Sequence, residues 1–244
     1  MGPRLEQPAP ADHMPAGDDV RERAINPRDW EVRAIIEGRK TVTRRPVDHV
    51  NGIVKVTEFK PSDALRYDWI MRDRRMLWND LEHGELLGRC PFGVTGDRLW
   101  VRETFTIHSH PQEGQGCGYW IDYKAGGFVV KGAWNPDPPD WWESCADGGW
   151  LSSARMPRFA SSLTLEVVSV RVERLQEITE EDAIAEGCCG DWVDRGLTIG
   201  WEVSSAVEEF AYLWGIGHGK RYPWDPNPWV WRIEHKALAA EVDA

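Results

Sequence analysis

Alternation of apolar and polar residues predicts strands in three parts of the chain. Residues 98–105 alternate clearly, and Glu103 falls on the apolar face, where a carboxylate needs a partner or a function. Residues 162–175 form a longer strand, whose apolar phase switches at 167–168 and so indicates a bulge. The third strand covers residues 227–234 and places its tryptophans on one face. We therefore expect strands along much of the chain.

Apolar residues with helical spacing predict three helices. The first covers residues 30–36, and Gly38 ends it, as glycine often does just beyond a helix. The second covers residues 178–187 and begins with Thr179 as its N-cap. The third covers residues 204–215, where an apolar stripe repeats at helical intervals. Helices and strands alternate irregularly along the chain, and strands outnumber helices.

These elements predict one α+β domain with two long insertions. We expect a small, closed or nearly closed β-barrel with helices beside it, in residues 21–236. The insertions are residues 50–89, of which residues 63–88 are expected to be partly helical, and residues 107–155, which are rich in glycine, proline and tryptophan. Residues 1–20 and 237–244 are expected to be tails.

Composition narrows the choice of partner. The 244 residues carry a net charge of −11, whereas proteins that wrap long nucleic acids usually have a basic face. A modified nucleoside or a short exposed nucleic acid fits this charge better. The 15 tryptophans suit either a core or a site that stacks flat rings.

Neither a membrane nor a cofactor is expected. No apolar run approaches the ~20 residues that span a bilayer, and no secretory signal is recognisable. The spacing of the five cysteines matches no zinc pattern, so we expect reduced thiols, no metal and a cytoplasmic protein. The oligomeric state stays open.

A cluster of cations follows the first helix, in residues 39–45. Four of these seven residues are basic, and a helix end that leads into a strand can hold them rigidly. The cluster is either an anion-binding edge or a solvated basic edge strand. Strict alternation would put Lys40 and Thr43 on opposite faces, so a shared site requires a bend after Gly38.

Five sequence blocks resemble one known family. They are residues 37–45, 96–104, 156–161, 172–187 and 227–231. Together they look like the ASCH-domain proteins, a PUA-like β-barrel superfamily, and most like its large phage and prophage members. If the chain is phage-encoded, its compartment would be the host cytoplasm.

The resemblance implies an amidohydrolase site. Small bacterial members of the family release acetate from N4-acetylcytidine with a lysine, a threonine and a glutamate, which fall here at Lys40, Thr43 and Glu186. Thr43 would attack the acyl carbon, and Lys40 would take its proton, since the adjacent arginines favour a neutral amine. Glu186 would protonate the leaving nitrogen.

Further residues are predicted to contact the substrate. Arg102 is a candidate ligand contact, and Glu103 either orients it or accepts from the edge of a base; an ion pair inside the barrel is the alternative. Trp100 and Trp229 are candidates for stacking on a base, and core packing is the alternative for each. The other candidates are Arg39, Arg44 and Arg45.

Two other functions remain open. A PUA-like module could bind RNA or a modified base without altering it. A ribonuclease is the third possibility, because lysine and arginine beside a phosphate can stabilise its transition state. No histidine pair is placed to act as the acid and base of such an enzyme, because His108 and His110 lie in the second insertion, where solvated histidines are expected.

Overall fold

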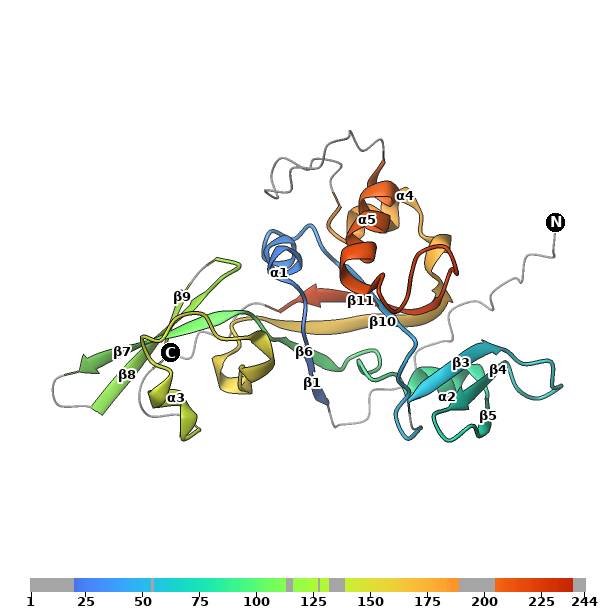
Figure 1. Ribbon diagram of the computed structural model, residues 1–244, viewed down its shortest axis with the longest axis horizontal. Coiled ribbons are helices and arrows are strands. Elements are labelled where there is room, and N and C mark those ends of the chain that lie inside the picture. Colours follow the sequence, from blue (N-terminus) through green and yellow to red (C-terminus); the bar gives the residue numbers. More distant parts are fainter. Residues whose placement is uncertain are drawn as a thin grey trace.

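The computed structural model describes residues 20–53, 55–112, 116–126, 128–131, 139–188 and 205–238. In these residues the protein is an α+β structure of three small sheets with a few short helices (Figure 1). The predicted tails, 1–20 and 237–244, lie almost entirely outside the described residues.

The central sheet has five strands in the order β1-β6-β10-β11-β2. Their bounds are β1 Glu22–Ile25, β6 Arg98–Val101, β10 Thr164–Arg174, β11 Trp229–Ala237 and β2 Val42–Pro46. β1 pairs with β6 in parallel, and the other neighbours pair antiparallel. Among the described strands β1 and β2 are the two edges, so this sheet is open rather than closed into the predicted barrel.

Three helices lie on the same side of β10 and β11 (Figure 1). They are α1 Asp29–Ile36, α4 Glu180–Ala185 and α5 Ala206–His218. Residues of α4 and α5 pack with Val230 of β11 in one buried apolar cluster. The apolar spacing therefore predicted these helices correctly, although α5 continues three residues beyond the predicted end at Gly215.

Local signals for helix ends and for the bulge are confirmed. Gly38 and Gly187 follow α1 and α4 with positive φ angles of 73° and 90°, which favour glycine. Thr179 caps α4 by accepting a hydrogen bond from the backbone N–H of Asp182. In β10 the register against β11 shifts between Val167 and Ser169, where the apolar phase switches.

The first insertion is mainly a sheet, so the prediction of a partly helical segment is largely wrong. Its elements are β3 Val56–Pro61, β4 Trp69–Asp73, β5 Trp78–Leu81 and the short helix α2 His83–Gly88. Buried and half-buried residues alternate along β4, which is the pattern of a strand with one face on the core. Phe59 and Trp69 of this sheet pack on Trp229 of β11.

The second insertion also forms a sheet, at the opposite end of the molecule (Figure 1). It contains β7 Phe105–Gln112, β8 Gly116–Tyr123, β9 Phe128–Lys131 and α3 Trp141–Ser144. Short 3-10 turns follow at Ser153–Arg155 and Arg158–Ala160, and a third, Leu175–Glu177, follows β10. The predicted continuous strand 98–105 is interrupted, because β6 ends at Val101 and β7 begins at Phe105.

Candidate active site

Lys40 is held where the end of α1 meets the end of α4. After Gly38, the backbone N–H groups of Arg39 and Lys40 both donate to the carbonyl of Ala34, at 2.9 and 3.0 Å. Lys40 then forms an isolated antiparallel bridge with Glu186. The chain therefore turns after Gly38, and Lys40 precedes β2 rather than forming part of it.

Gly187 allows the end of α4 to approach Lys40 closely. A Cβ atom at this position would lie 2.9 Å from the Cβ of Ala34 and 3.3 Å from the Cβ of Lys40. Real Cβ atoms do not approach that closely without movement of a neighbour. The glycine thus brings Glu186 and Lys40, which are 146 residues apart in the sequence, to the same place.

The Lys40 ammonium group is fully buried and faces two carboxylates. Its Nζ lies 2.5 Å from Oε2 of Glu186, 3.1 Å from the carbonyl of Glu186 and 3.5 Å from Oε1 of Glu31. Burial raises the pKa of Glu31, but the positive charges of Arg45 and Lys40, together with hydrogen bonds from the Arg28 backbone and the Arg45 side chain, outweigh it and bring the value to about 2. Lys40 therefore contacts acids, not the arginines that the sequence placed beside it.

Thr43 contacts a histidine that sequence reasoning missed. Its Oγ1 lies 3.0 Å from Nε2 of His235, and both residues are buried. The pairing of β2 with β11 sets Thr43 opposite Ile233, so His235, two residues further on, shares its face. Trp229, Trp231 and Ile233 share one face of the strand, and His235 is the next position on that face. A polar residue at this position was the sequence signal that could have identified it.

His235 is a neutral imidazole with one nitrogen unpartnered. Burial lowers its pKa most, the charges of Lys40 and Arg45 lower it further, and the value falls to about 3 despite the opposing charge of Glu31. Its Nδ1 has no hydrogen-bond partner among the described residues. This face of β2 therefore combines a hydroxyl, a neutral imidazole and nearby cations.

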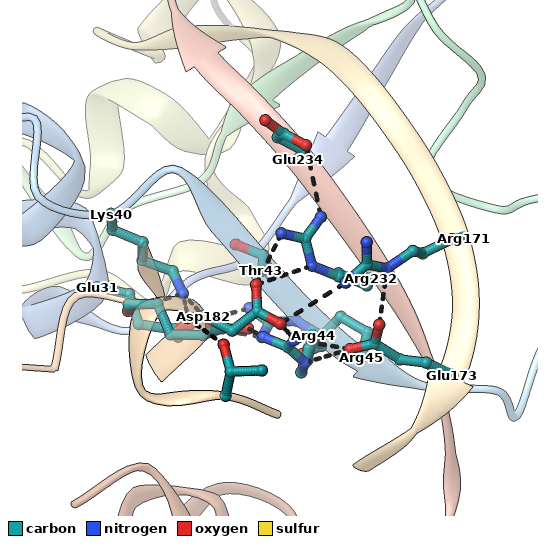
Figure 2. Close-up of polar contacts among 12 residues, drawn as sticks. Glu31, Lys40, Thr43, Arg44, Arg45, Arg171, Glu173, Asp182, Arg232 and Glu234 are labelled. Atoms are coloured by element: carbon teal, nitrogen blue, oxygen red, sulfur yellow. Dashed lines mark hydrogen bonds and ion pairs between the residues drawn. The ribbon is translucent and has the colours of Figure 1, made fainter. Parts of the chain in front are cut away.

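Arg44 points to the other face of β2 and joins a dense ion network (Figure 2). Its Nη2 lies 2.6 Å from Glu173 and 2.7 Å from Asp182, and its Nη1 lies 3.3 Å from Glu186. Arg232 reaches the second oxygen of Asp182 at 2.8 Å. Burial alone would lower the pKa of Arg44, but the three carboxylates raise it above its ordinary value.

Two other cations of the cluster lie nearer the surface. The guanidinium group of Arg39 is exposed, pairs with Glu37 and also donates to the carbonyl of Gly187 at 3.1 Å. Arg45 is half-buried, lies 3.4 Å from Glu31 and donates to the carbonyl of Arg44 at 3.0 Å. The predicted basic edge is therefore divided among three surroundings, and only its outermost part is solvated.

Trp100, Arg102 and Glu103 lie away from Lys40. Two strands, β10 and β11, separate β6 from β2, which corresponds to roughly 14 Å across the sheet. The guanidinium group of Arg102 lies 4.7 Å from the ring of Trp100, and Glu103 accepts a hydrogen bond of 2.7 Å from Ser162. The expected contact of Arg102 with Glu103 is therefore replaced by separate partners. Burial raises the pKa of Glu103 to about 7.

Trp229 lies at the opposite end of β11 from His235. The two residues are six positions apart along the strand, which corresponds to about 20 Å at ~3.4 Å per residue. Its ring packs on Trp69, at 5.0 Å between centroids, and Arg174 covers it at 4.3 Å. Trp229 thus attaches the first insertion to the central sheet, which is the core role that was its alternative.

Three further features bear on possible metal, histidine and membrane sites. Within the described ranges, no three histidine, cysteine or acidic side chains are grouped so that they could hold a metal ion. His108 lies 3.2 Å from Asp122 and 3.4 Å from Asp147, and the side chain of His110 is outside the described part of the chain. Of the helices described, none has both the length and the apolar character to cross a membrane.

Comparisons of the chain with protein-family models, with curated proteins and with solved structures found no match. The function therefore has to be argued from the geometry around Lys40, Thr43 and Glu186.

Proposed function

We propose that the chain is an ASCH-type, PUA-like amidohydrolase that removes an acyl group from a modified nucleobase or nucleoside, with N4-acylcytidine as the model substrate. The contact of 2.5 Å between the Lys40 ammonium group and the Glu186 carboxylate carries the proposal. The resemblance to ASCH proteins assigns the chemistry to these residues and to Thr43, and the contact joins two blocks that are far apart in the sequence.

The Lys40–Glu186 pair can supply both a base and an acid. Transfer of one proton from Nζ to Oε2 along their contact leaves a neutral amine and a carboxylic acid, with no change in net charge. The amine is then ready to accept a proton and the acid to donate one.

The first half of the reaction would transfer the acyl group to Thr43. The Oγ1–H proton passes to the Lys40 amine as Oγ1 forms a bond to the acyl carbon. The carbon–nitrogen bond of the amide then breaks, and the leaving nitrogen takes the proton of Glu186. Lys40 ends as an ammonium ion and Glu186 as a carboxylate.

The second half would release the acid and restore the site. Water attacks the acyl carbon and gives a proton to Glu186, while the Thr43 oxygen leaves and takes back a proton from Lys40. The net reaction adds one water to the amide, and all three side chains return to their starting state. The reaction needs neither a metal nor an organic cofactor.

One observation favours a second candidate, a module that binds a modified base without cleaving it. Lys40, Thr43 and Glu186 are only 1–2% exposed, so their polar atoms are enclosed before any substrate is bound. Buried ion pairs of this kind also occur as purely structural elements. The two candidates differ in whether Thr43 is chemically required.

The decisive experiment compares two threonines of the same segment. The protein is incubated with a panel of N-acylated nucleosides and with single-stranded RNA, and the products are identified by mass spectrometry. Thr43→Val removes the buried hydroxyl with little change in shape, and Thr41→Val is the matched control because Thr41 is exposed. We expect Thr43→Val to lower kcat/KM by at least ~10³-fold, and Thr41→Val by less than about threefold.

Each product pattern selects one function. Release of the acyl group by the wild type but not by Thr43→Val supports the amidohydrolase. Saturable binding without any product supports the non-cleaving module, and shortened RNA supports a ribonuclease.

A further inference from the structure

His235 has no role in the reaction described above, yet it is the hydrogen-bond partner of the proposed nucleophile. Its Nε2 lies 3.0 Å from Oγ1 of Thr43. We propose that His235 is a positioning residue whose Nε2–H donates to Thr43 Oγ1 and so fixes the direction of the threonine hydroxyl. The inference rests on the proposed function, because Thr43 is the group that it positions.

The direction of this hydrogen bond follows from the unpartnered Nδ1. A neutral imidazole carries one N–H donor and one nitrogen acceptor. If Nε2 accepted from Thr43, Nδ1 would carry a buried N–H with no acceptor among the described residues. Orphaned buried N–H groups are rarer in proteins than acceptors with spare capacity. The tautomer with the proton on Nε2 leaves only a lone pair unpartnered on the ring. The O–H of Thr43, whose side chain contacts no other hydrogen-bond partner among the described residues, can rotate toward the site.

The surroundings of His235 keep the ring neutral, as this arrangement requires. Lys40, at the end of the α1 turn, and Arg45, on β2, place positive charge near the imidazole, while Glu31 of α1 opposes them in part. Burial acts in the same direction as the cations, and the pKa of about 3 excludes a charged ring at neutral pH. A charged ring would carry a second N–H donor at Nδ1, where no acceptor is found among the described residues.

The consequence for the reaction is an oriented nucleophile. When Oγ1 accepts from Nε2–H, its own hydrogen points away from the ring and is free for transfer to Lys40. A lone pair of Oγ1 remains for the acyl carbon. Without the imidazole, the hydroxyl group can rotate among several orientations. Misplacement of a reacting group can cost about 10²-fold in rate.

The hydrogen-bond direction can be measured without any substrate. Long-range nitrogen–proton NMR correlations of the wild-type chain distinguish a protonated ring nitrogen from one with a lone pair. We expect the proton of His235 on Nε2, no titration between pH 5 and 8, and a changed Nε2 signal in Thr43→Val. A proton on Nδ1, or a titration near pH 6.5, would overturn the inference.

The effect on catalysis is tested with a matched pair of variants. In His235→Gln the side-chain amide can place an N–H near the position of Nε2, whereas His235→Leu has no donor. For an N-acylated nucleoside that the wild type cleaves, we expect His235→Leu to lower kcat about 10–100-fold with KM changed less than threefold. We expect His235→Gln to recover most of the rate.

The outcomes separate this inference from the function on which it rests. An active wild type with an equally active His235→Leu overturns the inference alone. A wild type that cleaves no acylated nucleoside overturns the amidohydrolase and the catalytic role of His235 with it. Should His235→Leu fail to fold, the NMR measurement on the wild type and the His235→Gln rate still decide the question.

Discussion

Thr43 and Arg44 are adjacent in the sequence, but β2 turns them toward two different surroundings. Arg44 faces Glu173, Asp182 and Glu186, so its buried charge is matched by several carboxylates. Thr43 contacts the neutral imidazole of His235, whose Nδ1 has no hydrogen-bond partner in the described part of the chain. A fully paired network stabilises one arrangement of the chain, whereas an incompletely partnered polar pair beside charges has capacity left for a substrate or a proton.

Glu186 links the Arg44 network to Lys40, the proposed base. One of its oxygens lies 3.3 Å from Arg44, and the other lies 2.5 Å from Lys40. The ion network therefore fixes the position of the carboxyl group that the proposed reaction uses. This division of roles predicts that changes on the Arg44 face act mainly on stability, and changes on the Thr43 face mainly on activity.

The largest expected effect is the loss of stability in Arg44→Met. Methionine has similar length but removes the buried charge that pairs with Glu173 and Asp182, and breaking a buried ion pair costs about 3–5 kcal/mol. Urea denaturation of the wild type and the variant measures the difference. Arg171→Met is the control, because Arg171 is largely exposed and pairs with Glu173 at its second oxygen.

We expect Arg171→Met to change the free energy of unfolding by less than ~1 kcal/mol, as is typical of exposed ion pairs. Equal losses in the two variants would contradict the assignment of a structural role to the Arg44 face. A large loss of activity in Arg44→Met with unchanged stability would reverse the two roles.

The sequence allowed good prediction where the signal is local. Gly38 and Gly187 mark helix ends because both adopt a positive φ, and the phase switch in residues 162–175 marks the bulge of β10. The first insertion was misread, because leucine, methionine and glutamate suit helices and β4 owes its form to tertiary packing on the core. Closure of a sheet depends on strand tilt and register, which the alternation of single strands does not contain.

The candidate site could be predicted from the sequence only in part. Lys40 and Glu186 were named through the family resemblance, and their contact depends on the close approach at Gly187. His235 could be recognised as the partner of Thr43 only from the strand register, which sets Ile233 opposite Thr43. The role of Glu31 could not be predicted either, because its contacts with Lys40 and Arg45 depend on how α1 packs against the following segment.

The two faces should also respond differently to acid. The pKa of His235 is lowered from 6.5 to about 3, so the unfolded chain binds this proton first as the pH falls. The stability that neutral His235 contributes is present above pH 6.5 and is lost between pH 6.5 and 3. Asp182 on the Arg44 face has its pKa lowered from 3.8, so its contribution is lost only below about pH 4.

Between pH 7 and pH 4 the His235 contribution amounts to about 3 kcal/mol of unfolding free energy. His235→Gln removes this titration, so its stability should decline less over that range than that of the wild type. Urea denaturation at several pH values measures both curves. Parallel curves for the two proteins would show that the imidazole is not held neutral by its surroundings.

The smallest effect is expected for a variant that disturbs the approach of α4 to Lys40. Gly187→Ala places a Cβ against Ala34 and Lys40, so the end of α4 has to move away from Lys40. We expect a loss of about 1–3 kcal/mol in unfolding free energy from the strained φ and the overpacking. The displaced Glu186 should also lower the activity by up to ~10²-fold.

Gly38→Ala is the matched control for this change. Gly38 also has a positive φ, of 73°, but a Cβ there would meet no atom of the described residues within 4 Å. It carries the backbone penalty of about 1 kcal/mol without the steric one. The difference between the two variants therefore isolates the approach of α4 to Lys40. Equal stability and equal activity in the two variants would show that the close approach at Gly187 is not required to hold the carboxyl group of Glu186 against Lys40. The proposed connection between the Arg44 network and Lys40 would then be wrong.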